Sequence, residues 1–84
     1  MPRYHFHVVD DDDYIDTRGV DLADLDAARD MALKYSGAAI GEIRSHFWRG
    51  GTWTMRVTDG NDLTLFELML VSAEGPALAT THPG

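Results

Sequence analysis

The sequence predicts an α+β domain of the order β-β-α-β-β, in which one long helix packs on a four-stranded antiparallel sheet. Three observations predict it: helical periodicity from Asp24 to Trp48, two extended segments before this stretch, and a hairpin pattern after it. A chain of 84 residues has room for a single core, so we expect one domain over residues 1–71. Residues 72–84 show no periodicity and are rich in Gly, Pro, Thr and Ala, so we expect a flexible tail.

The helix is predicted by the angles at which its side chains fall. At about 100° per residue, one arc collects small and apolar side chains and is expected to be the buried face: Leu25, Ala28, Ala32, Ser36, Ala39, Ile40, Ile43 and Phe47. Asp24 is the expected N-cap, because its carboxylate can accept a hydrogen bond from a free N–H of the first turn. Gly50 and Gly51 can take the left-handed conformation that ends a helix.

Two extended segments precede the helix. Residues 4–9 alternate between two faces, as a strand with one buried side does, and the aspartates at 10–13 repel one another and suit a turn. Residues 14–22 form a weaker extended segment, in which we expect a bulge or bend at Gly19. We expect the two segments to pair as a hairpin.

In that hairpin the register places Val8 opposite Ile15 on the inner side and His7 opposite Asp16 on the outer side. A nearby carboxylate favours the imidazolium form of histidine, so we expect the pKa of His7 to be raised. The aspartate-rich turn does not fit an EF-hand calcium loop, since Ile15 and Asp21 stand where that loop needs Gly and Glu.

A second hairpin is predicted after the helix. Residues 52–58 alternate, and the turn signal Asp59-Gly60-Asn61-Asp62 leads into a returning strand over residues 63–71. The expected register pairs inner side chains of the two strands: Met55 with Phe66, and Trp53 with Leu68. Because the helix returns the chain, the third strand can pair with the first, and we expect the strand order 2-1-3-4.

Charge and composition argue against several classes of partner. Seven basic and fourteen acidic side chains give a net charge of −7, which opposes contact with nucleic-acid phosphates and with an anionic membrane surface. No apolar segment has the length that crosses a bilayer, and no export leader is recognisable. Without cysteine there is neither a disulfide framework nor a thiolate metal site, which suits the cytoplasm.

Several short motifs together resemble a known family. They are the opening Met-Pro-Arg-Tyr-His-Phe-His, the acidic turn, the helix start Asp-Leu-Asp-Ala-Ala-Arg, and Val57-Thr58-Asp59-Gly60. Over roughly residues 1–70 the chain is similar to a family of short bacterial proteins classed as a domain of unknown function, from which it departs at Ala23 and in its helix glycines. The resemblance implies a small β-β-α-β-β domain in a bacterial cytoplasm, and it implies no activity and no catalytic residue.

Polar side chains are expected to gather on the sheet face away from the helix: His5, His7, Asp16, Arg56 and Glu67. Two histidines on one side of a strand stand about 6.5 to 7 Å apart, but no further ligand has the spacing of a metal framework. Arg56 and Glu67, as diagonal neighbours, fit an ordinary cross-strand ion pair. We therefore expect no catalytic residue, no metal and no cofactor. A ligand- or metal-binding domain, or a minor enzyme, using the face around His5 and His7 is the alternative.

Two smooth or apolar surfaces predict contact with another protein. On the helix, Gly37 and Gly41 lie opposite the core, where each glycine costs about 0.5 to 1 kcal/mol relative to alanine. They fit either drift at a tolerant position or a strip along which another backbone approaches, with Trp48 as an anchor. The last strand also carries apolar side chains that the helix cannot cover. The candidate interface consists of Gly37, Gly41, Trp48, Leu65, Met69 and Val71.

The sequence therefore predicts a small interaction or self-associating module without catalytic activity. We expect its partner to be a second copy of the chain, in a homodimer, or another protein, and expect neither nucleic acid nor membrane as a partner. The pathway in which such a module works is unknown.

Overall fold

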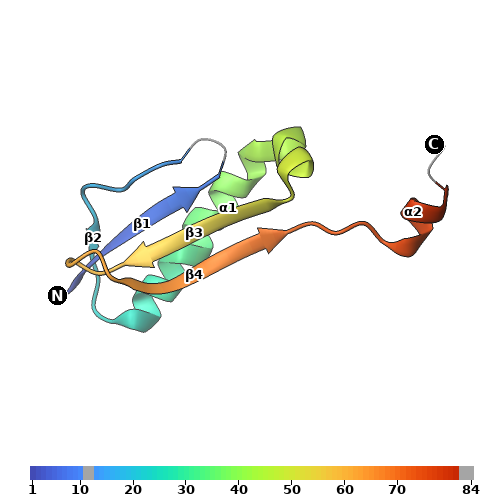
Figure 1. Ribbon diagram of the computed structural model, residues 1–84. Coiled ribbons are helices and arrows are strands. Elements are labelled where there is room, and N and C mark those ends of the chain that lie inside the picture. The colour runs from blue at the N-terminus through green and yellow to red at the C-terminus, as the bar shows by residue number, and fades with distance from the viewer. Residues whose placement is uncertain (11–12, 82–84) are drawn as a thin grey trace.

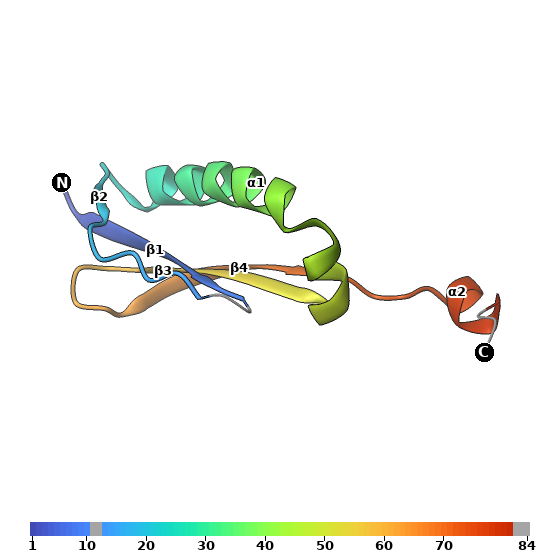
Figure 2. The ribbon, with the colours of Figure 1, turned by 90° about the horizontal axis from the view of Figure 1, so that it is seen from above.

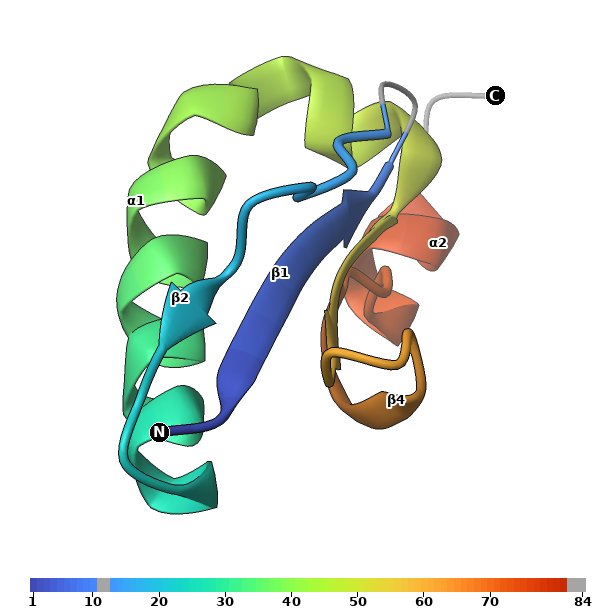
Figure 3. The same cartoon turned by 90° about the vertical axis from the view of Figure 1, so that its left-hand side faces the viewer.

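The computed structural model describes residues 1–10 and 13–81, without the side chains of residues 43–46, 49–50 and 79–81. Along the described residues the elements are β1 (Arg3–Val9), β2 (Val20–Asp21), α1 (Leu25–Gly50), β3 (Thr52–Thr58), β4 (Thr64–Val71) and α2 (Pro76–Thr81). The strands form one antiparallel sheet in the order β2-β1-β3-β4, with α1 on one face (Figure 1, Figure 3). The predicted α+β class and strand order are confirmed.

The long helix begins and ends where its predicted caps lie. Asp24 Oδ1 accepts a hydrogen bond from the N–H of Ala27 at 2.9 Å. At the other end, Gly51 has a φ of +76° and donates its N–H to the Phe47 carbonyl oxygen at 2.7 Å. Figure 2 shows the last turns of α1 bending around the end of the sheet.

The core lies between α1 and the inner face of β1 and β3, and its buried apolar members are Tyr4, Phe6, Ala28, Ala32, Phe47, Trp53, Met55 and Val57. The helix packs chiefly against β3. As a consequence the inner side chains of the outermost strand, Phe66, Leu68 and Leu70, are only partly buried.

The buried face of α1 differs from the predicted arc at two described positions. Leu25 is 37% exposed, whereas Met31 packs against the core. Met31 lies three residues after buried Ala28 and therefore next to it on the helix surface. The side chain of Ile43 lies outside the described residues.

The first hairpin has a different register from the predicted one. Val8 pairs with Tyr14, not with Ile15, through two 2.9 Å backbone hydrogen bonds. Tyr4 pairs with Val20. Five residues of β1 (4–8) thus face seven of the returning segment (14–20), because this segment bulges and regains strand geometry only over β2. The turn before it includes residues 11–12, which lie outside the described residues.

The second hairpin is also shifted by two residues from the predicted register, since the ladder pairs Val57 with Phe66, Met55 with Leu68 and Trp53 with Leu70. A shift of two keeps the same side chains on the inner face. Its cause is the turn, where Asp59 Oδ1 accepts the N–H groups of Asn61 and Leu63 at 2.8 and 3.0 Å. Leu63 therefore belongs to the turn.

The residues after β4 include one regular element. The composition suggested a tail without periodicity, but residues 76–81 form the short helix α2. Figure 1 shows α2 beyond the end of the sheet, away from α1.

Candidate functional site

The polar side chains predicted to share the helix-free face of the sheet do meet there. His5 lies opposite Thr58, and His7 lies opposite Arg56. Arg56 is in turn directly opposite Glu67, not diagonal to it as expected. No ion pair joins Arg56 to Glu67 within the described part of the chain, and the buried Nε of Arg56 lacks a hydrogen-bond partner there.

The peptide of Asp16 holds both histidine rings of β1. Its N–H donates to Nδ1 of His7 at 3.1 Å, and its carbonyl oxygen accepts from Nδ1 of His5 at 2.9 Å. The two rings lie 6.1 Å apart between centroids and are nearly parallel, at 4°. One loop residue therefore fixes the orientation of two imidazoles through its backbone alone.

The carboxylate of Asp16 completes the sheet at the point where the returning segment bulges. Oδ2 accepts the N–H of Phe6 at 3.1 Å, in place of a strand carbonyl. Oδ1 accepts the N–H groups of Arg18 and Gly19 at 3.1 and 3.0 Å. Burial alone would raise the pKa of Asp16, but the three backbone donors outweigh it, and the pKa is lowered.

Hydrogen bonds to both ring nitrogens fix the tautomer of His7. Since Nδ1 accepts from the Asp16 N–H, the ring proton is on Nε2, which donates to Thr58 Oγ1 at 3.0 Å. Burial, followed by the nearby Arg56 charge, lowers the pKa of His7, and the opposing effect of Asp16 is smaller. The predicted neighbourhood of His7 and Asp16 is therefore right, whereas the predicted rise in pKa is wrong, because burial and the Arg56 charge outweigh the opposing effect of Asp16.

Gly19 allows the loop to approach β1 this closely. A Cβ at this position would lie 2.8 Å from Cγ of Arg3 and 2.9 Å from Cε1 of His5. Its φ of +75° also lies in the left-handed region that favours glycine. The bend predicted at Gly19 is thus a close contact with strand β1.

Beside these rings lies a shallow depression of about 210 Å³, lined by His5, His7, Ile15, Asp16, Asp59, Gly60 and Asp62. Within the described residues no three His, Asp or Glu side chains are grouped so that they could hold a metal ion. The Asp16 and Asp59 carboxylates are occupied by backbone N–H groups. The polar groups of this face therefore hold the returning loop against strand β1, and we call them the polar clamp.

The candidate interface residues of β4 are exposed on the same helix-free face. Leu65, Met69 and Val71 have exposed fractions of 43%, 63% and 59%. Glu67 stands among them as the charged side chain of the strand. The apolar patch and the polar clamp thus occupy different parts of one sheet face.

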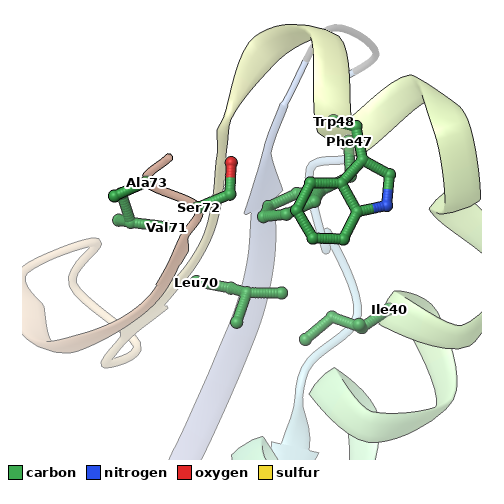
Figure 4. Close-up of a pocket in the computed structure, with 7 residues that line it drawn as sticks. All are labelled: Ile40, Phe47, Trp48, Leu70, Val71, Ser72 and Ala73. Carbon is green, nitrogen blue, oxygen red and sulfur yellow. The ribbon is translucent and has the colours of Figure 1, made fainter. Parts of the chain in front are cut away.

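A second apolar surface lies where α1 bends around the end of the sheet. A groove of about 430 Å³ is lined there by Ile40, Phe47, Trp48, Leu70, Val71, Ser72 and Ala73. Figure 4 shows Leu70 pointing toward the space between Ile40 and the Trp48 indole. Trp48 is 71% exposed and packs edge-on against Phe47.

The two helix glycines named as candidates are exposed, and a Cβ at Gly37 or Gly41 would meet nothing within 4 Å. Neither glycine is required by packing against the described residues.

Sequence reasoning missed other parts of these sites. Thr58 could have been found from its strand parity, but the groove depends on the bend of α1, which periodicity does not reveal.

A four-stranded antiparallel sheet with one helix on one face, a loop held against β1 and exposed apolar side chains on β4 define a two-layer α+β domain. Residues 3–71 match the family described as Domain of unknown function (DUF6894), and the chain belongs to that family. Neither the curated proteins nor the solved structures include a match to it. Within the described residues, no helix combines the length and apolar character needed to span a membrane.

Proposed function

We propose that the chain works by protein–protein contact, first of all with a second copy of itself, and not as an enzyme. The observation that carries this proposal is the exposure of Leu65, Met69 and Val71 on the sheet face opposite α1. Exposed apolar side chains gathered on one face are typical of interaction sites in soluble domains. The single helix cannot cover it, because α1 packs on the other face.

The hydrogen bonds of the polar face support a structural role for His7 and Asp16. Both ring nitrogens of His7 are bonded, and the Asp16 carboxylate takes three backbone N–H groups. A general base or nucleophile must instead have an atom free to reach a substrate.

We place this module in a bacterial cytoplasm. The absence of cysteine from the sequence supports that setting, and so does the family resemblance.

Solution mass tests the proposal. Light scattering from low to high micromolar concentration should show a rise from the mass of one chain toward twice that mass. Leu65→Glu and Met69→Glu should each keep the chain monomeric while leaving its circular dichroism unchanged, because both side chains project into solvent from the folded monomer.

Gly41→Leu is the matched variant for the helix surface. It should leave the dimer intact, since Gly41 lies on α1 and away from the β4 patch. A well-folded monomer at high micromolar concentration would contradict the proposal. Loss of the dimer in Gly41→Leu alone would move the contact to the helix.

A further inference from the structure

The free edge of β4 offers hydrogen-bonding groups in a regular row. Ser72 donates its N–H to the Gly51 carbonyl oxygen at 3.0 Å, which fixes the phase of the β3–β4 ladder. Because inward and outward groups alternate along an antiparallel strand, the even-numbered residues 66, 68 and 70 bond to β3. Glu67, Met69 and Val71 therefore direct their N–H and C=O groups to the open edge, where β4 is the last strand of the sheet (Figure 1).

This edge lacks the usual protection against strand pairing. Natural edge strands are short, bulged, covered or rich in proline and lysine. Strand β4 runs for eight residues, contains neither proline nor lysine, and carries one charge, at Glu67. Its ladder with β3 is regular from Phe66 to Val71, and the register shifts only near the turn, between Val57 and Thr58.

We infer that β4 pairs antiparallel with β4 of a second copy, edge to edge, with Leu68 at the two-fold axis. The pairing rests on the self-association proposed above. It joins the open edges of β4, and it sets Leu65 of one copy beside Val71 of the other on the face opposite α1, so that the exposed apolar side chains of the two copies become neighbours. It joins two four-stranded sheets into one continuous sheet, with both α1 helices on the same face, because a two-fold axis perpendicular to a sheet preserves its faces.

A second copy fits this edge for two reasons found in β4 itself. The inner side chains Phe66, Leu68 and Leu70 are only partly buried by α1, and the pairing sets Phe66 of one copy opposite Leu70 of the other. It also sets Glu67 opposite Met69 of the other copy. Centring the pair on Glu67 instead would place two carboxylates face to face, which destabilises a strand pair.

The area of a single strand pair sets the expected strength. Eight residues of antiparallel strand span about 27 Å, and such a contact buries less than the roughly 1,600 Å² of a standard stable interface. We therefore expect a weak dimer that forms at high micromolar concentration. This is the range in which the mass and exchange measurements must be made.

Amide hydrogen exchange by NMR tests the pairing directly. On passing from dilute to concentrated protein, the N–H groups of Glu67, Met69 and Val71 should slow by at least about tenfold. Those of Phe66, Leu68 and Leu70, already bonded to β3, serve as the internal control. Protection that appears only when another protein is added would overturn the assignment to a second copy.

Single cysteines provide an independent test, because the chain has none of its own. At the two-fold axis the two Leu68 residues form a non-hydrogen-bonded pair, whose Cα atoms lie about 4.5 Å apart, within the range of a disulfide. Leu68→Cys should therefore form a covalent dimer under mild oxidation. Val71→Cys, on the same strand, should not, since its two copies lie about 20 Å apart.

The outcomes separate the two proposals. A dimer by mass whose edge amides stay unprotected and whose Leu68→Cys variant does not cross-link would overturn the edge pairing and leave self-association standing. A chain that is monomeric at high micromolar concentration would overturn both. Should Leu68→Cys weaken the fold, the exchange experiment on the unmodified chain decides.

Discussion

At the scale of single residues, Asp16 is the centre of the polar face. It bonds two histidine rings through its peptide and three backbone N–H groups through its carboxylate. The histidines and Asp16 were recognisable in the sequence as neighbours. The direction of the His7 pKa shift was not, because it depends on how deeply the ring is buried and on the nearby Arg56 charge, and strand parity reveals neither.

The pH dependence of stability follows from His7. Its pKa is lowered in the folded chain, so below about pH 6.5 the unfolded chain binds this proton more tightly. The contribution of His7 to the free energy of unfolding is therefore complete above about pH 6.5 and is lost as pH falls toward the lower folded value. Denaturation curves across this range should show the loss, and His7→Gln, which cannot gain the proton, should remove it. An NMR midpoint for His7 above the model-peptide value would contradict this.

Gly19 gives a second prediction at this scale. Gly19→Ala should lower the free energy of unfolding by about 2 kcal/mol or more, because it adds a Cβ against Arg3 and His5 at a positive φ. Gly60→Ala is the matched control, since nothing lies within 4 Å of its Cβ, and it should change stability by less than about 0.5 kcal/mol. Equal effects of the two changes in urea denaturation would show that the loop does not need its close approach to β1.

At the scale of elements, the sequence predicted what local signals control. The caps of α1 at Asp24 and Gly51, the inner faces of the strands and the strand order all follow from periodicity and turn residues. The registers predicted for both hairpins were wrong. In each, a side-chain carboxylate bonds the backbone, Asp16 in the first and Asp59 in the second, and takes residues out of the ladder.

The exposed glycines of α1 lower the stability of the helix. Gly37→Ala should raise the free energy of unfolding by about 0.5 to 1 kcal/mol, because alanine reduces the freedom of the unfolded chain and meets no neighbour here. Ala38→Gly, at the exposed next position of the same helix, should lower it by a similar amount. Thermal or urea unfolding measures both. A stabilised monomer that no longer dimerises would place the contact on α1.

At the scale of the whole molecule, the negative net charge limits the partners that we expect. The net charge is −7, Arg3 is paired with Asp21 at 2.9 Å, and Arg29 is paired with Asp26 at 3.3 Å. We therefore expect no binding to duplex DNA or RNA at physiological salt, because the seven basic residues are scattered along the sequence and outnumbered two to one by acidic ones. A gel shift at micromolar protein should leave the duplex free. Salt-sensitive retention of the duplex would contradict the prediction.

The two edges of the sheet differ, and this difference bears on the number of copies that could join through them. On the side away from β4, the strand is only Val20–Asp21, and the Phe6 N–H is already taken by the Asp16 carboxylate. Within the described residues, that side therefore shows no regular row of free groups to which a further strand could bond. In the dimer that we infer, joining through β4 uses the open edge of both copies and leaves the β2 side of each sheet at the two ends. The bulge at Asp16 should then keep further strands from adding, so we expect the association to stop at two copies and not to continue into a fibre.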